Sequence, residues 1–298
     1  MLGIILALIV AFLKSLWELA GKVFTDEKQA TSLDEYSLSL WARLLSFVLL
    51  LPLVIYFWFP YISQSLWMTL FVSSLLGSVA TVTALKAVKY GDLSLVSPLT
   101  ALTIPFLLIT SYLITHEVAN LYGYIGVLVI FFWTYFLQLH EAQRVLLGPI
   151  KAIFTDSWAR YMIVTALIWS ITSPIDKIWV VELGALNWMF LTNACITIIL
   201  AIYMFLMKKG FSLKQMTQTH AIKKVWAITV LWGLWIFLQM LALKYTLVIY
   251  VIALKRASGM FSVFLGWIFY KEKNILEKFT AAAIMLCWVI IISLFGNI

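Results

Sequence analysis

The chain has 298 residues, of which 64% are hydrophobic and 11% are charged, and its formal net charge is +8. A soluble domain has roughly 25% charged and about 45–50% apolar residues, so this composition excludes a soluble enzyme, a secreted disulfide scaffold and a disordered protein. The positive charge does not indicate nucleic acid, because it lies in short connections between hydrophobic runs, where it normally sets membrane orientation.

Apolar runs of similar length follow one another along the chain. A helix needs about 20 apolar residues to cross a bilayer core about 30 Å thick, whereas a membrane strand needs only about 9–11. We therefore predict transmembrane helices over 2–21, 37–59, 66–86, 94–114, 119–138, 158–178, 185–206, 225–243, 248–269 and 275–295. The first run is expected to be a retained span, because no basic segment precedes it. The expected fold class is an all-α membrane protein with ten transmembrane helices.

The sequence repeats itself at an offset of about 155–158 residues, which relates Ser15 to Ser170, Lys22 to Lys177 and Glu117 to Glu272, as well as Ala84-Leu85-Lys86 to Ala242-Leu243-Lys244. A unit of five spans is odd, so the second copy must enter the membrane in the opposite orientation. The pattern predicts two inverted five-helix repeats over 1–138 and 158–298, joined by a loop over 139–157. Many secondary transporters are built in this way, with the substrate site near the midplane between the halves.

Basic residues in the connections predict the orientation. Most of those outside the spans fall in odd-numbered connections, and Lys177 and Lys244 fall on the other side. The positive-inside rule then places the odd connections in the cytoplasm and both termini outside. We expect an integral, multi-pass protein of the cell (inner) membrane.

Charged residues within the spans are the first candidates for a site. Each charge at the bilayer centre costs at least about 2.5–3.5 kcal/mol, so such residues face the protein interior. Lys14 and Glu18 share a helix face, and Arg43 is expected at the same depth, so these three can form a cluster. The alternative is a structural ion pair that fixes the first two spans.

Lys255 and Arg256 enter from the opposite surface, where Asp176 ends the sixth span and can neutralise one of them. Lys255 can alternatively extend to the interface. The buried cations outnumber the carboxylates, which favours an anionic or zwitterionic substrate, with Arg43 or Arg256 binding a carboxylate or phosphate in bidentate fashion. Glu18 is the candidate for a coupling proton, provided that it lies away from the cations.

Several uncharged residues complete the candidate site. Pro98 and Pro105 predict a bent fourth span that lines the pathway, and Ser173 is interpreted in the same way for the sixth span; a static bend is the alternative. Trp17 can contribute an aromatic wall or simply pack, and Gln239 can bind substrate or join helices by hydrogen bonds.

A resemblance to a known family rests on short motifs in both halves. They are Ala84-Leu85-Lys86 through Leu95-Val96-Ser97-Pro98, Ile104-Pro105 to Glu117, Ala253-Leu254-Lys255-Arg256-Ala257-Ser258, Phe264-Leu265-Gly266-Trp267 and Lys271-Glu272-Lys273. With ten spans in two halves, the chain resembles the EamA-type members of the drug/metabolite transporter superfamily. The resemblance implies transport of amino acids, other metabolites or drugs. It also implies cytoplasmic termini, opposite to the charge count, and this chain lacks the proline that many members carry early in the ninth helix.

The predicted function is secondary transport of a small organic metabolite, such as an amino acid or a related anionic or zwitterionic solute, by alternating access. No phosphate-binding loop, catalytic motif or metal-ligand spacing is visible, so we expect neither an enzyme nor a cofactor or metal. The alternatives are multidrug efflux of lipophilic cations and a membrane enzyme or scaffold acting on lipid. The expected partners are the substrate, a coupling proton or ion, and the bilayer, without nucleic acid, in a monomer or homodimer.

Overall fold

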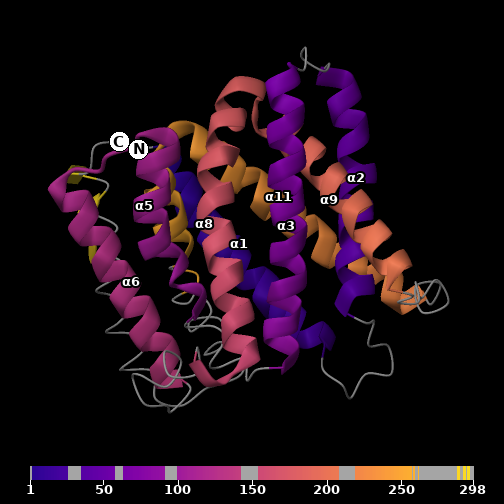
Figure 1. Ribbon diagram of the computed structural model, residues 1–298, viewed down its shortest axis with the longest axis horizontal. Helices are drawn as coiled ribbons and strands as arrows, with labels where there is room; N and C mark the ends of the chain where they lie inside the picture. The colour runs from indigo at the N-terminus through magenta and orange to yellow at the C-terminus, as the bar shows by residue number, and fades with distance from the viewer. Residues whose placement is uncertain are drawn as a thin grey trace.

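The computed structural model of the chain is built from α-helices (Figure 1). It describes residues 2–25, 35–57, 63–90, 99–141, 154–207 and 219–256, together with 258, 261, 287–288, 291–292 and 294–295 near the C-terminus. No strand occurs within these ranges, in agreement with the predicted all-α class.

Within the described ranges the helices follow the predicted spans. They are α1 (Leu2–Thr25), α2 (Glu35–Phe57), α3 (Gln64–Tyr90), α5 (Thr103–Thr115), α6 (Leu121–Glu141), α8 (Ser157–Leu183), α9 (Ala185–Leu206), α11 (Thr219–Tyr245) and α12 (Val248–Arg256). The tenth predicted span, 275–295, lies for the most part outside the described residues.

The helices have the length and surface of a membrane protein. In the described part of the chain, 64–87, 157–183 and 185–206 are long and apolar enough to cross a bilayer, and shorter apolar helices occur beside them. Large apolar side chains are exposed on their outer faces, for example Ile55, Met68 and Phe205. So much exposed apolar surface is unfavourable in water, whereas it is favourable in contact with lipid. The chain is an integral membrane protein.

Helices far apart in sequence make the main contacts. α1 packs against α11 and α12, and α8 packs against α3 and α5. α2 packs against α9, and α3 and α8 stand side by side in Figure 1. The partners of α1, the first predicted span, are α11 and α12, the eighth and ninth spans. The partners of α8, the sixth span, are α3 and α5, the third and fourth spans, so the two sets of partners are five spans apart.

α12 is the most enclosed of these helices. Residues 248–254 are all buried, and the helix contacts α1, α5, α6, α8 and α11. A helix that is apolar on every side belongs in a protein core. Lys255 and Arg256 directly follow these buried residues in α12, so the packing of the helix places their charges inside the protein.

The start of α5 is interrupted next to a proline. Within the predicted span 94–114, residues 99–100 are helical, residues 101–102 form a turn, and α5 begins at Thr103; residues 94–98 lie outside the described residues. Pro105 has no N–H to give to the carbonyl of Ala101, and this carbonyl accepts the N–H of Ile104 over 2.9 Å instead. The Thr103 hydroxyl donates to the carbonyl of Thr100 over 2.7 Å. The interruption exposes threonine hydroxyls to a neighbouring helix.

A second proline, Pro174, lies inside α8. It leaves the carbonyl of Ser170 without its usual partner within the helix. The hydroxyl of Thr110 on α5 donates to this carbonyl over 2.7 Å. The proline therefore creates an acceptor that ties α5 to α8.

Candidate functional site

Lys255 is the centre of a polar group inside the protein. Its Nζ donates a hydrogen bond of 2.9 Å to Oε1 of Gln239 on α11. The same nitrogen lies 5.7 Å from the ring centroid of Trp235, also on α11, which is within the range of a cation–π contact. These neutral partners orient the ammonium group without cancelling its charge.

Three other charged side chains surround Lys255. Lys14 on α1, Arg256 on α12 and Asp176 on α8 all lie close enough for their charges to act on it. Lys14 Nζ also donates to the Ser258 hydroxyl over 3.0 Å. We call Lys14, Asp176, Lys255 and Arg256 the charged group. It joins helices from the beginning, middle and end of the chain.

Arg256 is held by the interrupted start of α5. Its Nη1 donates to the hydroxyl of Thr100 over 3.2 Å, and its Nη2 donates to the hydroxyl of Thr103 over 3.0 Å. The side chain is only 6% exposed. The turn before Pro105 thus supplies two acceptors that fix the plane of the guanidinium.

Asp176 is oriented by a tryptophan of the next helix. Trp188 on α9 is fully buried, and its Nε1 donates to Asp176 Oδ1 over 2.8 Å. Its ring stacks on that of Trp179, with 6.0 Å between the centroids. Because packing fixes the indole, the carboxylate keeps one orientation beside Lys255.

Arg43 belongs to a second polar group. Its Nη2 donates to the Thr81 hydroxyl over 3.2 Å, and its guanidinium carbon lies 5.3 Å from the ring centroid of Trp232. Asn193 Nδ2 donates to the Arg43 carbonyl over 3.0 Å, which joins α9 to α2. Whether Arg43 also joins the expected trio with Lys14 and Glu18 stays a prediction, because the Glu18 side chain lies outside the described residues.

Some of the remaining predicted site residues lie outside the described part of the chain, and the others have local roles. The side chains of Trp17 and Glu18, and the whole of Pro98, lie outside the described residues. Ser173 is buried in α8, where its hydroxyl donates to the carbonyl of Trp169 in the same helix over 2.7 Å. Pro105 bends the chain beside the charged group without contributing a polar atom.

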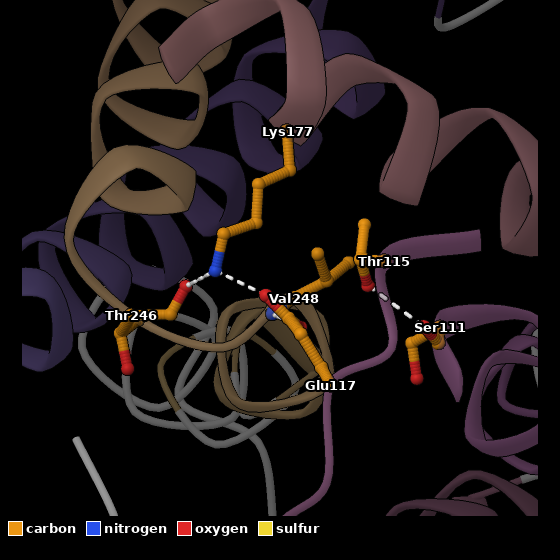
Figure 2. A network of polar contacts seen from close by, with 6 residues as sticks. All are labelled: Ser111, Thr115, Glu117, Lys177, Thr246 and Val248. Carbon is orange, nitrogen blue, oxygen red and sulfur yellow. Dashed lines mark hydrogen bonds and ion pairs between the residues drawn. The ribbon is translucent and has the colours of Figure 1, made fainter. Parts of the chain in front are cut away.

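An ion pair that the sequence did not predict lies at one end of the bundle (Figure 2). Lys177 on α8 pairs with Glu117, which follows α5, and its Nζ donates to the Thr246 carbonyl over 2.7 Å. The N–H of Val248, the first residue of α12, donates to Glu117 Oε2 over 2.9 Å. The sequence repeat relates Lys22 to Lys177 and Glu117 to Glu272. It therefore draws attention to Lys177 and Glu117, but it does not indicate that these two residues pair with each other.

The charged group is suited to binding an anion. Ammonium and guanidinium groups donate charge-assisted hydrogen bonds to carboxylate or phosphate oxygens, and the planar guanidinium does so in bidentate fashion. Among the described residues, no group of three or more His, Cys, Asp or Glu is arranged to hold a metal ion.

Comparisons with known proteins bear on the family and the fold of the chain. Residues 1–138 match the model of the EamA-like transporter family, over the same range as the predicted first repeat. A comparison with curated proteins gives no match. Among 28 matching chains of solved structures, one described only as "Crystal structure of protein" superposes with a TM-score of 0.76. It covers 99% of this chain and 98% of that chain at 13% identity, which shows a shared fold alone.

Proposed function

We propose that this chain, whose residues 1–138 match the model of the EamA-like transporter family, is a secondary transporter of a small anionic or zwitterionic metabolite. The family match and the apolar helices support a membrane transporter of the drug/metabolite superfamily. The proposal adds the class of solute and transport by alternating access.

The meeting of Lys14, Lys255 and Arg256 beside a single described carboxylate, Asp176, supports this solute class. Glu18, one turn after Lys14 in α1, adds at most one more negative charge. Among the described residues of the charged group, the cations outnumber the carboxylates. Like charges repel strongly away from water, so a bound anion would stabilise the group more than it would a neutral site.

The packing supports two inverted repeats over 1–138 and 158–298, joined by 139–157. α1 begins and α8 ends near one end of the bundle: Gly3 lies against Thr246, and Lys177 donates to the carbonyl of the same residue. The contacts of α1 with α11 and α12 correspond to those of α8 with α3 and α5. Opposite directions and exchanged partners are what an inverted repeat of five spans requires.

Each residue of the group then has a role. Arg256, held by Thr103, binds one carboxylate or phosphate edge of the solute, and Lys255 and Lys14 bind another. Asp176 binds the ammonium group of a zwitterion. A gradient of the solute itself, or a coupling proton or ion, drives the cycle.

Efflux of lipophilic cations is less compatible with these contacts. Such substrates would need open aromatic faces and excess negative charge. The described faces of Trp232 and Trp235 lie under Arg43 and Lys255, and the charged group is cationic.

A binding screen on purified protein tests the proposal. The panel contains monocarboxylates, dicarboxylates, phosphorylated metabolites, neutral amino acids and lipophilic cations, and a true ligand raises the thermal midpoint by mass action. We expect stabilisation by anions or zwitterions. Lys255→Gln should weaken their affinity by about 1.5–3 kcal/mol, the contribution of a hydrogen bond to a charged group.

Lys86→Gln is the matched control. Lys86 makes the same kind of contact, 5.4 Å above the Tyr161 ring, but the charges that act on Lys255 do not include it. Its affinity should stay near that of the parent protein. Stabilisation by lipophilic cations alone, or equal effects of both substitutions, would contradict the proposal.

A further inference from the structure

We propose that the Glu117–Lys177 ion pair is a latch that closes one end of the transport pathway and opens once in each cycle. The latch is defined by Glu117, Lys177, Thr246 and Val248 (Figure 2). This inference rests on the proposed function, because a closing element has a role only in a protein that alternates between two openings.

The latch joins four parts of the bundle at a single point. Glu117 lies in the connection between α5 and α6, and Lys177 lies on α8. Thr246 lies between α11 and α12, and Val248 begins α12. Figure 2 shows the Lys177 side chain reaching down from α8 to the Thr246 carbonyl and the Glu117 carboxylate. One ion pair therefore spans the boundary between the two predicted repeats.

The start of α1 closes against the same connection. A Cβ added at Gly3 would lie 2.8 Å from Thr246 Cβ and 3.1 Å from the Tyr245 carbonyl carbon, so only glycine allows this approach. The side chains of Lys177 and Glu117 are 17% and 10% exposed. These contacts bring the start of α1, the end of α11 and the ion pair together at this end of the described bundle.

The latch is coupled to the charged group through α8. Lys177 follows Asp176 directly, and consecutive residues of a helix point about 100° apart. Lys177 forms the ion pair of the latch, and the charge of Asp176 acts on Lys255. A shift of α8 that separates Lys177 from Glu117 must also move Asp176 relative to the solute, so binding and closure affect each other.

An ion pair suits a contact that must be made and broken. Its net contribution is small because water solvates both charges well once it reaches them. Removing one partner alone is unfavourable, because the other charge is left buried without compensation. The latch therefore resists partial opening and permits complete opening to water.

The first test measures access to a residue beneath the latch. Ser173 lies one turn before Lys177 on the same face of α8 and is buried. In a background with Cys195→Ala and Cys287→Ala, Ser173→Cys is labelled in purified protein with a water-soluble thiol reagent. Glu117→Gln together with Lys177→Met should raise the labelling rate about tenfold, which corresponds to about 1.4 kcal/mol of lost closure.

Glu182→Gln is the control, since it removes an exposed carboxylate from the same helix end and leaves the latch intact. Equal labelling rates in the control and in the double variant would overturn the proposal. A rate as high as that of protein denatured in detergent would indicate unfolding, and the cross-link below then decides.

The second test fixes the latch. In Glu117→Cys/Lys177→Cys, a cleavable bifunctional thiol reagent should abolish solute exchange in liposomes, and reduction should restore it. Unchanged exchange after complete cross-linking would overturn the latch. If the uncross-linked variant and the parent both exchange no member of the panel, the proposed function fails, while the labelling rates still show whether the ion pair closes this end.

Discussion

The Arg256 guanidinium on α12 donates a hydrogen bond of 3.0 Å to the Thr103 hydroxyl on α5, across 153 positions of sequence. Thr103 also donates its own proton to the Thr100 carbonyl, so it satisfies the interrupted turn and orients the cation at once. The orientation of the Arg256 guanidinium and the turn before Pro105 therefore both depend on the Thr103 side chain.

Thr103→Val keeps the shape of this side chain and removes both hydrogen bonds. We expect thermal stability to fall by about 1–3 kcal/mol, the cost of leaving buried polar groups unsatisfied, and affinity for the solute to fall with it. Thr115→Val is the control, because the Thr115 hydroxyl donates only to Ser111 within α5. Similar affinities in the two variants would show that Thr103 does not position Arg256.

Asp176→Asn should separate zwitterions from anions. The amide keeps an oxygen to accept the Trp188 N–H and removes the negative charge beside Lys255. Affinity for a simple anion should rise, because one source of repulsion is lost, whereas affinity for a zwitterion of similar size should fall. Calorimetric titration of one solute of each kind measures both. Parallel changes for the two solutes would remove Asp176 from contact with the ammonium group.

Thr110 and Pro174 should be energetically coupled. Thr110→Val removes the donor that satisfies the Ser170 carbonyl and should lower thermal stability by about 1 kcal/mol. Pro174→Ala restores an N–H that can donate to the same carbonyl within α8. In the double variant the loss from Thr110→Val should therefore shrink, and a double-mutant cycle of unfolding midpoints detects this. Strict additivity would mean that the threonine does not compensate the proline.

Close packing at Gly123 gives a prediction about stability alone. A Cβ added there would lie 1.9 Å from Tyr250 Oη and 2.8 Å from its Cζ, and Tyr250 is completely buried. Gly123→Ala should destabilise the protein by about 1–3 kcal/mol through overpacking. At Gly233 the nearest atom, Ser46 Oγ, is 3.5 Å away, so Gly233→Ala should be neutral or stabilising in the same melting experiment.

Hydropathy predicted where most helices lie because the bilayer fixes their length. The run 185–206 is α9 (Ala185–Leu206), and the run 158–178 lies within α8 (Ser157–Leu183). The fourth run was predicted over 94–114, and within its described part a turn at residues 101–102 separates helical residues 99–100 from α5. Pro98 and Pro105 predicted a bend in this span. The position of the bend depends on which backbone carbonyls, left without a partner by the prolines, accept another hydrogen bond, as that of Ala101 does from the N–H of Ile104.

The grouping of charges could not be predicted in the same way. Depth along a span can be counted from sequence, but the partner of each helix face cannot. Lys14 was therefore grouped with Glu18 and Arg43, which are expected at the same depth. The sequence did not indicate that the charge of Lys14 also acts on Lys255. The pairing of Glu117 with Lys177 depends likewise on the approach of α8 to the start of α12, which is a tertiary contact.

Counterflow in liposomes tests the central claim most directly. Purified protein is reconstituted with an unlabelled anionic or zwitterionic solute from the binding screen inside, and entry of the labelled solute is followed without ATP. We expect transient accumulation of label that is lost in Lys255→Gln and kept in Lys86→Gln. Absence of counterflow with every bound solute, or equal accumulation in both variants, would contradict a secondary transporter that binds its solute through the charged group.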